Sequence, residues 1–259
     1  SPSRPSRMGS CRQSSKLRQR GRHHDRVRLF RTMNLKLAIW LAASAVKQLV
    51  RSDRLRPDQY LLDLLTKQYL YAAAVGETWA TMEWRGRKIL KSPTDLSMYA
   101  ELLQRVRPEL VIETGTYEGG SALFMADLMN VFGISGKVVT IDIAPRKAPE
   151  HMRVTALAGS SLADNIVFHV TAMRDMTPKI VILDSDHSYK HVLAELRLYS
   201  CFLASGDYLI VEDTSTDMLD GGPRRAVREF LADNQEFQID QNCERLGLTF
   251  NRGGYLTKL

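Results

Sequence analysis

The sequence contains few cysteines, and none of them is arranged for disulfide or zinc chemistry. Its 259 residues include three cysteines, Cys11, Cys201 and Cys243, which lie far apart and outside any CxxC pattern. An odd number at such spacings argues against a disulfide framework and against a cysteine zinc site. It is typical of proteins from a reducing compartment, so we predict a cytoplasmic location.

A basic stripe with interleaved aromatic residues is also missing from most of the chain, although the net charge is +7. Residues 1–56 contain 15 Lys and Arg against two acids and therefore carry +13. Residues 57–259 contain 21 Lys and Arg against 27 acids and carry −6. Because the basicity belongs to the N-terminal part and the body is mildly acidic, we predict no nucleic-acid partner.

No apolar run is long enough to predict a membrane span. Residues 1–33 are rich in Ser, Arg and Pro without an apolar pattern, which predicts a disordered basic arm in which Met8 and Met33 are both plausible starts. Residues 34–51 are mostly apolar but are interrupted by two lysines. Two interpretations of this segment stay open: a helix that packs on the domain or a partner subunit, and an amphipathic helix at the inner membrane surface.

From residue 95 onward the chain alternates short aliphatic runs with helical patterns, and it has no internal repeat. The aliphatic runs lack polar alternation, so we expect strands buried on both faces in a parallel sheet covered by helices. We predict seven strands, at 109–114, 137–142, 154–160, 179–184, 207–213, 237–242 and 253–259. The predicted fold is therefore α/β, with a doubly wound, mostly parallel seven-stranded sheet over 95–259. A helical N-terminal region over 34–94 precedes it, and Asp95 is the expected N-cap of the first domain helix.

The first turn of this domain lacks the GxGxxG dinucleotide fingerprint. In VIETGTYEGGS (111–121), Tyr117 stands where that pattern requires glycine. Glu113 would repel a pyrophosphate but suits a cofactor that carries an amino group. Glycines at this turn let a ligand approach the backbone, and Asp142 at the end of the next strand can accept hydrogen bonds from ribose hydroxyls.

These features favour S-adenosylmethionine over NAD. Ser160, after the third strand, is placed to flank an adenine. The simpler alternative is a tight turn with two solvated acids. The predicted cofactor-binding residues are Glu113, Gly115, Thr116, Gly119, Ser121, Asp142, Ser160 and Asp184.

Two further aliphatic runs end in acids, VILDSDH (181–187) and YLIVEDT (208–214). Neighbouring strand ends would bring Asp184 or Asp186 beside Glu212 and Asp213, where the carboxylates would repel unless something positive lies between them. Oxygen ligands indicate a hard cation, with Mg²⁺ favoured over Mn²⁺ or Ca²⁺. A metal-bound hydroxyl loses its proton more easily, and a nearby base takes that proton.

Asp184, Asp186 and His187 are the candidates for the metal ligand and the base from the first of these runs. We predict Asp186 as the metal ligand from the first run, and Asp186 and His187 as the catalytic candidates. Asp184 could instead hold loop backbone groups or the cofactor, so the identity of the base among the three stays open. Two alternatives are a zinc pair formed by His187 and His191, and an Asp186 that only caps a helix.

Four segments resemble the cephalosporin hydroxylase family, which also contains the rhamnosyl O-methyltransferases of mycobacterial glycolipid assembly. They lie within residues 80–259 and include DSDH, VEDT and GGPRRAVREFL. The resemblance implies a class I methyltransferase fold (Rossmann-like), S-adenosylmethionine, and Mg²⁺ on Asp186, Glu212 and Asp213. Nothing in the chain supplies the two histidines and a carboxylate that iron hydroxylases use. The segment TSTDMLDGGP (214–223) departs from the family's NxNGHP-type loop beside the acceptor pocket.

We therefore predict an Mg²⁺- and S-adenosylmethionine-dependent O-methyltransferase. Its acceptor is expected to be a sugar hydroxyl, such as the rhamnosyl group of a glycolipid, or another small natural product with vicinal hydroxyls. The alternatives are an NAD-type oxidoreductase and a non-catalytic, membrane-associated partner subunit that binds the cofactor or the glycolipid. We also expect a homo-oligomer.

Overall fold

The computed structural model describes residues 57–72, 78–146, 149–215 and 221–259. The predicted arm 1–33, the segment 34–51 and residues 216–220 of the acceptor-side loop lie outside these residues. Residues 61–259 form one compact unit. Within the described part of the chain, no helix has the length and apolarity needed to cross a membrane.

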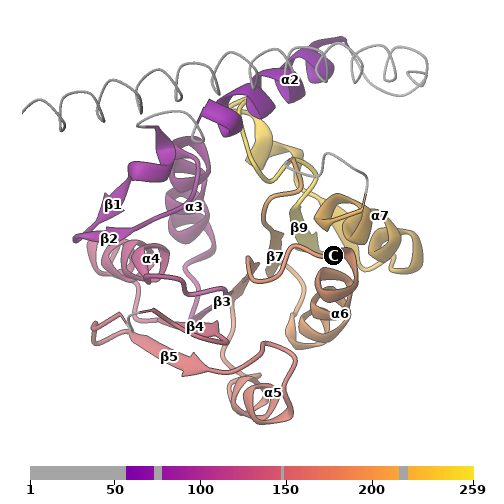
Figure 1. The fold of residues 1–259 in the computed structure, drawn as a ribbon. Helices are drawn as coiled ribbons and strands as arrows, with labels where there is room; N and C mark the ends of the chain where they lie inside the picture. Colours follow the sequence, from indigo (N-terminus) through magenta and orange to yellow (C-terminus); the bar gives the residue numbers. More distant parts are fainter. Residues whose placement is uncertain (1–56, 73–77, 147–148, 216–220) are drawn as a thin grey trace, which may run out of the picture. The chain divides into compact units, whose positions relative to one another are not determined.

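A seven-stranded sheet forms the centre of this unit, in the order β5-β4-β3-β6-β7-β9-β8 (Figure 1). The last strand along the chain, β9, pairs antiparallel with β7 and β8, and the other pairings are parallel. The strands are β3 Leu110–Thr114, β4 Lys137–Asp142, β5 Val154–Ala158, β6 Lys179–Leu183, β7 Tyr208–Val211, β8 Phe237–Ile239 and β9 Tyr255–Lys258. The predicted fold class is confirmed, and the strand order reverses between β3 and β6, which is where ligands bind in such sheets.

Helices cover both faces of the sheet because both faces of its central strands are apolar. Successive side chains of a strand point to opposite faces, so Val111 packs with one helical layer and Leu110 and Ile112 pack with the other. The first layer comprises α3 Pro93–Val106 and α4 Gly120–Val131. The second comprises α5 Asp164–Thr171, α6 Tyr189–Tyr199 and α7 Pro223–Asp233. Each fully buried aliphatic side chain contributes about 1.5–3 kcal/mol, so these strands anchor the fold.

The described residues before α3 contain a helix and a hairpin. The helix is α2 Pro57–Ala72, and a 3₁₀ turn at Trp79–Thr81 precedes the hairpin strands β1 Glu83–Trp84 and β2 Arg87–Lys88. Arg85 and Gly86 join the two strands with positive φ angles of 52° and 71°, the conformation that tight two-residue hairpins require. The predicted helical region 34–94 therefore contains a hairpin in addition to the helix α2.

Helix α3 begins earlier than the sequence predicted. Ser92 is its N-cap and accepts a hydrogen bond from the Asp95 backbone N–H at 3.1 Å, with Pro93 in the first turn. The expected N-cap, Asp95, is instead buried, and its carboxylate accepts hydrogen bonds from Thr249 at 2.6 Å and Tyr255 at 2.9 Å. Asp95 thus ties the start of α3 to the C-terminal part of the chain, which fixes the segment just before α3.

The remaining differences concern the ends of elements. The strand predicted at 237–242 ends at Ile239, and a 3₁₀ turn follows at Gln241–Glu244. Helix α6 passes directly into a 3₁₀ turn at Ser200–Phe202. The strand β8 ends because the Asp240 carboxylate accepts a hydrogen bond from the Asn242 N–H at 3.0 Å and caps the 3₁₀ turn.

Candidate active site at the carboxyl ends of the strands

A cavity of about 520 Å³ lies at the carboxyl ends of β3, β4, β6 and β7. Its walls combine the glycine turn after β3 with the acids that follow the other strands. Seven of the predicted site residues line it: Gly115, Thr116, Ser121, Asp142, Asp184, His187 and Asp213. The turn and the second acidic run therefore belong to one site.

The glycine at position 115 is needed for a contact within the protein. Gly115 has a φ of +92°, and a Cβ on it would lie 1.9 Å from the backbone oxygen of Asp184. Its N–H donates to the Ile141 carbonyl at 2.7 Å. The sequence suggested that this glycine lets a ligand approach, whereas the structure uses it to bring the loop after β3 against the loop after β6. Gly119, with a φ of +77°, is the N-cap of α4 and packs closely on Pro149.

The carboxylate of Asp142 organises the cofactor side of the cavity. It accepts hydrogen bonds from the backbone N–H groups of Tyr117 and Ala144, both at 2.8 Å. A carboxylate has about four acceptor positions, so it retains capacity for ribose hydroxyls. Arg146 lies over the Tyr117 ring at 4.5 Å, beside this group. Ser160 follows β5 next to this loop, where Gly159 N–H donates to the Asp142 carbonyl at 2.9 Å.

Glu113 is completely buried behind the turn, and one of its oxygens has no hydrogen bond among the described residues. Thr140 donates to Oε2 at 3.1 Å, and Thr116 in turn bonds Thr140 at 2.7 Å. The other oxygen, Oε1, lies 3.9 Å from Lys91 Nζ and has no hydrogen bond of good geometry among the described residues, although Ser121 is near enough to lower the pKa of the carboxyl. Burial raises the pKa of Glu113 to about 7. A buried acceptor of this kind is costly unless a donor reaches it, and a cofactor amino group would be such a donor.

Lys91 lies between the acids and separates them, and no feature of the sequence singles it out. Its Nζ donates to Asp184 Oδ2 at 2.8 Å and to Glu212 Oε1 at 2.7 Å, and the side chain is only 2% exposed. Burial opposes the lysine charge, but Asp184, Glu212 and Glu113 together raise the pKa of Lys91 well above its usual value. Lys91 is therefore a buried cation among three carboxylates.

A second group that the sequence did not reveal surrounds Glu212. The Tyr99 hydroxyl on α3 donates a short hydrogen bond to Glu212, and Asn251 donates to the Tyr99 oxygen at 3.3 Å. Burial raises the pKa of Glu212 to about 8. Asn251 also accepts a bond from the Asp213 N–H at 3.0 Å, which supports the left-handed backbone of Asp213 (φ 59°). Such a conformation is unfavourable for a non-glycine residue, so the network holds Asp213 in a strained position.

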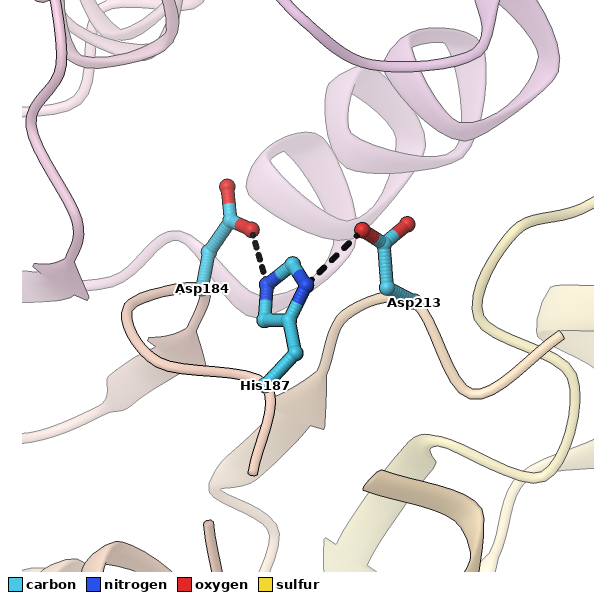
Figure 2. Close-up of side chains that lie close together, drawn as sticks. All are labelled: Asp184, His187 and Asp213. Carbon is cyan, nitrogen blue, oxygen red and sulfur yellow. Dashed lines mark hydrogen bonds and ion pairs between the residues drawn. The ribbon is translucent and has the colours of Figure 1, made fainter. Parts of the chain in front are cut away.

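Asp184, His187 and Asp213 form the acidic cluster that opens to the cavity (Figure 2). His187 lies between the two carboxylates, with Nε2 3.2 Å from Asp184 Oδ1 and Nδ1 3.2 Å from Asp213 Oδ2. One ligand atom from each of the three lies within 4.8 Å of the others. Burial opposes the imidazolium charge, but the bond to Asp184 and the charge of Asp213 raise the pKa of His187 to about 9.

Asp186 is not part of this cluster. Its exposed carboxylate accepts a hydrogen bond from the Ser188 N–H at 2.7 Å, just before α6. The chain turns directly after β6, and Asp184 and His187, three residues apart, line the cavity, whereas Asp186 does not. The geometry therefore favours Asp184 over the predicted Asp186 as the ligand from this run.

The alternative zinc pair is not assembled either. His191 Nε2 lies 3.2 Å from Ser161 Oγ and 3.4 Å from Glu195 Oε1, whereas His187 bonds Asp184 and Asp213. The two imidazoles, four residues apart on the chain, thus serve different neighbours. His191 and Glu195 belong to the packing of α6.

The model of the family described as rhamnosyl O-methyltransferase/CmcI matches residues 76–259. The rhamnosyl O-methyltransferase of Mycobacterium leprae (strain TN) is 36% identical over 195 residues, which cover 70% of this chain and 84% of the relative. The chain belongs to the rhamnosyl O-methyltransferase/CmcI family. The protein of the same name from Mycobacterium tuberculosis (strain H37Rv) is 35% identical over 197 residues, 70% of this chain and 79% of the relative.

Solved structures of CmcI have the same fold as this family member. A CmcI apo structure is 25% identical with a TM-score of 0.58, and the match covers 70% of this chain and 77% of that one. A CmcI structure with Mg and SAM gives the same TM-score and coverage at 24% identity. The predicted family is confirmed, and so is the predicted class of enzyme, a class I S-adenosylmethionine-dependent O-methyltransferase.

Proposed function

We propose that this protein transfers the methyl group of S-adenosylmethionine to a hydroxyl of a sugar, with Mg²⁺ bound at the acidic cluster. The observation that carries the proposal is the shared cavity. The turn at Gly115, the ribose acceptor Asp142 and the acids Asp184 and Asp213 all line the same 520 Å³ space. The sugar acceptor is supported by the relatives, which are named rhamnosyl O-methyltransferases.

The residues present fit both bound groups. The buried Glu113 Oε1 lacks a hydrogen bond within the described residues, and Asp142 retains acceptor capacity. These two acids suit the amino group and the ribose hydroxyls of the cofactor. The second set of donors is made of carboxylate oxygens, which Mg²⁺ prefers. We assign Asp184, Glu212 and Asp213 to the metal, in place of the Asp186, Glu212 and Asp213 set predicted from the sequence. Asp184 and Asp213 line the cavity, whereas Glu212 is buried behind them; Lys91 and Tyr99 both bond its Oε1, so Oε2 is the oxygen that we assign to the metal.

When bound, S-adenosylmethionine supplies an electrophilic methyl group and Mg²⁺ lowers the pKa of the acceptor hydroxyl. The protein's own contribution is orientation and proton transfer. His187 is the imidazole nearest to Asp184 and Asp213, so we assign it as the base. Although burial opposes its charge, the two carboxylates raise its pKa to about 9 in the metal-free site, so it would act as the base once a bound cation replaced its proton between them. The fixed positions of Asp184 and Asp213 orient an acceptor toward the cofactor side of the same cavity.

Apolar side chains also line the cavity and suit the less polar part of an acceptor. Leu70, Trp79 and Leu90 line it together with the site residues. Trp79 packs edge-on against Phe250 with ring centroids 4.9 Å apart, so its position is fixed. A sugar that presents two hydroxyls to the acids and carries an apolar group would match both kinds of lining residue.

The proposal is tested with purified protein, radiolabelled S-adenosylmethionine and a panel of aryl glycosides that includes a rhamnoside. We expect methyl transfer to sugars with vicinal hydroxyls and its loss after chelation of divalent cations. Calorimetry should detect binding of S-adenosylmethionine and not of NAD. Full turnover in excess chelator would refute the metal role, and NAD binding without S-adenosylmethionine binding would favour the oxidoreductase alternative. Cofactor binding without any transfer across the panel would support the non-catalytic partner subunit.

The two interpretations of residues 34–51 can be separated in the same preparation. Peripheral contact with the inner membrane surface is supported by the apolar stretch with its basic flanks. Sedimentation with anionic vesicles should then be lost when residues 34–51 are deleted. Unchanged sedimentation would favour a helix that packs on the domain or on a partner subunit.

A further inference from the structure

We propose that Lys91 is a built-in counter-cation of the metal site, which holds Asp184 and Glu212 in position before any metal binds and shares them with the metal afterwards. The inference concerns a positioning residue and rests on the assignment of Asp184 and Glu212 made above.

Lys91 is enclosed by acids and is fixed on both sides along the chain. Two of its three N–H donors are used at 2.8 Å and 2.7 Å, and Glu113 lies at 3.9 Å. Directly after it, Ser92 caps α3, and the backbone before it continues from the β1–β2 hairpin. Gly120 at the start of α4 packs so closely on that hairpin that a Cβ would lie 2.2 Å from the Lys88 carbonyl. The lysine is therefore delivered to the acids by fixed backbone.

The two oxygens of the Asp184 carboxylate have different partners. Oδ2 accepts a hydrogen bond from Lys91 at 2.8 Å. Oδ1 lies 3.2 Å from His187 Nε2 (Figure 2). An oxygen that is held by Lys91 fixes the orientation of the other one toward the cavity. Lys91 thereby presents an oxygen of Asp184 where a cation in the cavity would meet it.

The same lysine limits the repulsion within the site. Four carboxylates, those of Glu113, Asp184, Glu212 and Asp213, converge on this end of the sheet, and Lys91 contacts three of them. Without the charge of Lys91, the carboxylates repel one another unless another cation binds between them. A variant without Lys91 should therefore depend on Mg²⁺ for stability more than the wild type does.

The experiment compares Lys91→Met with Lys179→Met by thermal unfolding, first in chelator and then across a magnesium titration. Lys179 is the matched control, because it is also 2% exposed and near an acid, Asp207, but lies at the first residue of β6, at the other end of the strand. In chelator, we expect Lys91→Met to lower the Tm by about 6–15 °C. Mg²⁺ should then raise its Tm by about twice the wild-type increment or more. Lys179→Met should lose stability without gaining extra response to Mg²⁺.

The outcomes separate this inference from the proposed function. If Lys91→Met responds to Mg²⁺ no more than the wild type does, the counter-cation role is wrong while the metal site stands. If the wild type shows no response but Lys91→Met does, Lys91 is supported and the metal requirement of the wild type is wrong. If neither responds, both are wrong.

A charge-balanced variant covers the case in which Lys91→Met does not fold. Lys91→Met combined with Glu212→Gln removes one charge of each sign, so it should be soluble and more stable than Lys91→Met alone. Loss of folding in this double variant as well, with Glu212→Gln alone folded, would show that Lys91 acts through packing and would overturn the proposal.

Discussion

The choice between Asp184 and Asp186 can be decided by neutralising each in turn. Asp184→Asn keeps the shape of the side chain but removes the charge that faces Lys91 at 2.8 Å and His187 at 3.2 Å. At an effective dielectric constant of about 20, two unit charges 2.8 Å apart attract by about 6 kcal/mol. Asp184 is 24% exposed and asparagine still accepts hydrogen bonds, so we expect a net loss of about 2–3 kcal/mol in the free energy of unfolding.

Asp186→Asn is the matched control, since the two residues are two positions apart. Asparagine can accept the same hydrogen bond from the Ser188 N–H, and the site is exposed. We expect its free energy of unfolding to change by less than about 0.5 kcal/mol.

The assay is urea unfolding of wild type, Asp184→Asn and Asp186→Asn, each in chelator and in Mg²⁺. At a concentration of about a hundred times Kd, Mg²⁺ should stabilise the wild type by about 2.7 kcal/mol. Asp186→Asn should keep this gain, and Asp184→Asn should lose most of it. The reverse result, with the gain lost in Asp186→Asn and kept in Asp184→Asn, would refute the assignment made from the structure and restore the one made from the sequence.

Three further predictions concern a glycine, two cysteines and the N-terminal arm. Gly115→Ala should unfold the protein or lower its free energy of unfolding by several kcal/mol, because the new Cβ would collide with the backbone oxygen of Asp184. Gly206 also has a positive φ, +86°, but has open space around it, so Gly206→Ala should cost about 1–2 kcal/mol by urea unfolding. Equal losses in the two variants would contradict the close contact at Gly115. Burial and the nearby Asp240 raise the pKa of the Cys243 thiol to about 12, whereas Cys201 is exposed. At pH 8, iodoacetamide should therefore label Cys201 and spare Cys243, as measured by peptide mapping. Equal labelling of the two would contradict the burial of Cys243. Deletion of residues 1–33 should leave the calorimetric affinity for S-adenosylmethionine unchanged, and loss of binding would show that the arm is not dispensable.

The sheet could be predicted from the sequence because its strands are defined by composition alone. Segments such as 109–114 and 179–184 are aliphatic without alternation, and only a sheet covered on both faces buries them. Once the strands are assigned as parallel, their carboxyl ends meet at one edge. The convergence of Asp142 and Asp213 on one cavity follows from that arrangement without knowledge of any side-chain angle.

The choice between two acids in DSDH could not be predicted in the same way. Beyond the last strand residue the period of two no longer applies, and the direction of each side chain depends on how the loop turns. Here Ser185 turns toward α6 and donates to Glu195 at 2.8 Å, and Asp186 bonds Ser188. Asp186 lies further from the end of β6 than Asp184 does, and it is not part of the cluster formed by Asp184, His187 and Asp213.

The presence of a cation at this site could be predicted from the sequence, but its identity as Lys91 could not. Four acids at buried strand ends require a cation, so the sequence demands a positive group at this edge. It does not say which of 36 Lys and Arg residues supplies it, since Lys91 is separated from its partners by 93 and 121 positions along the chain. Only the hairpin, which the sequence did not reveal, and the cap at Ser92 carry the lysine to the acids. The lysine comes from the segment before the sheet, and the acids come from the ends of its strands. The metal site is therefore complete only when that segment packs against the sheet. N-terminal truncation past residue 91 should remove the site, although the chain still contains every predicted ligand.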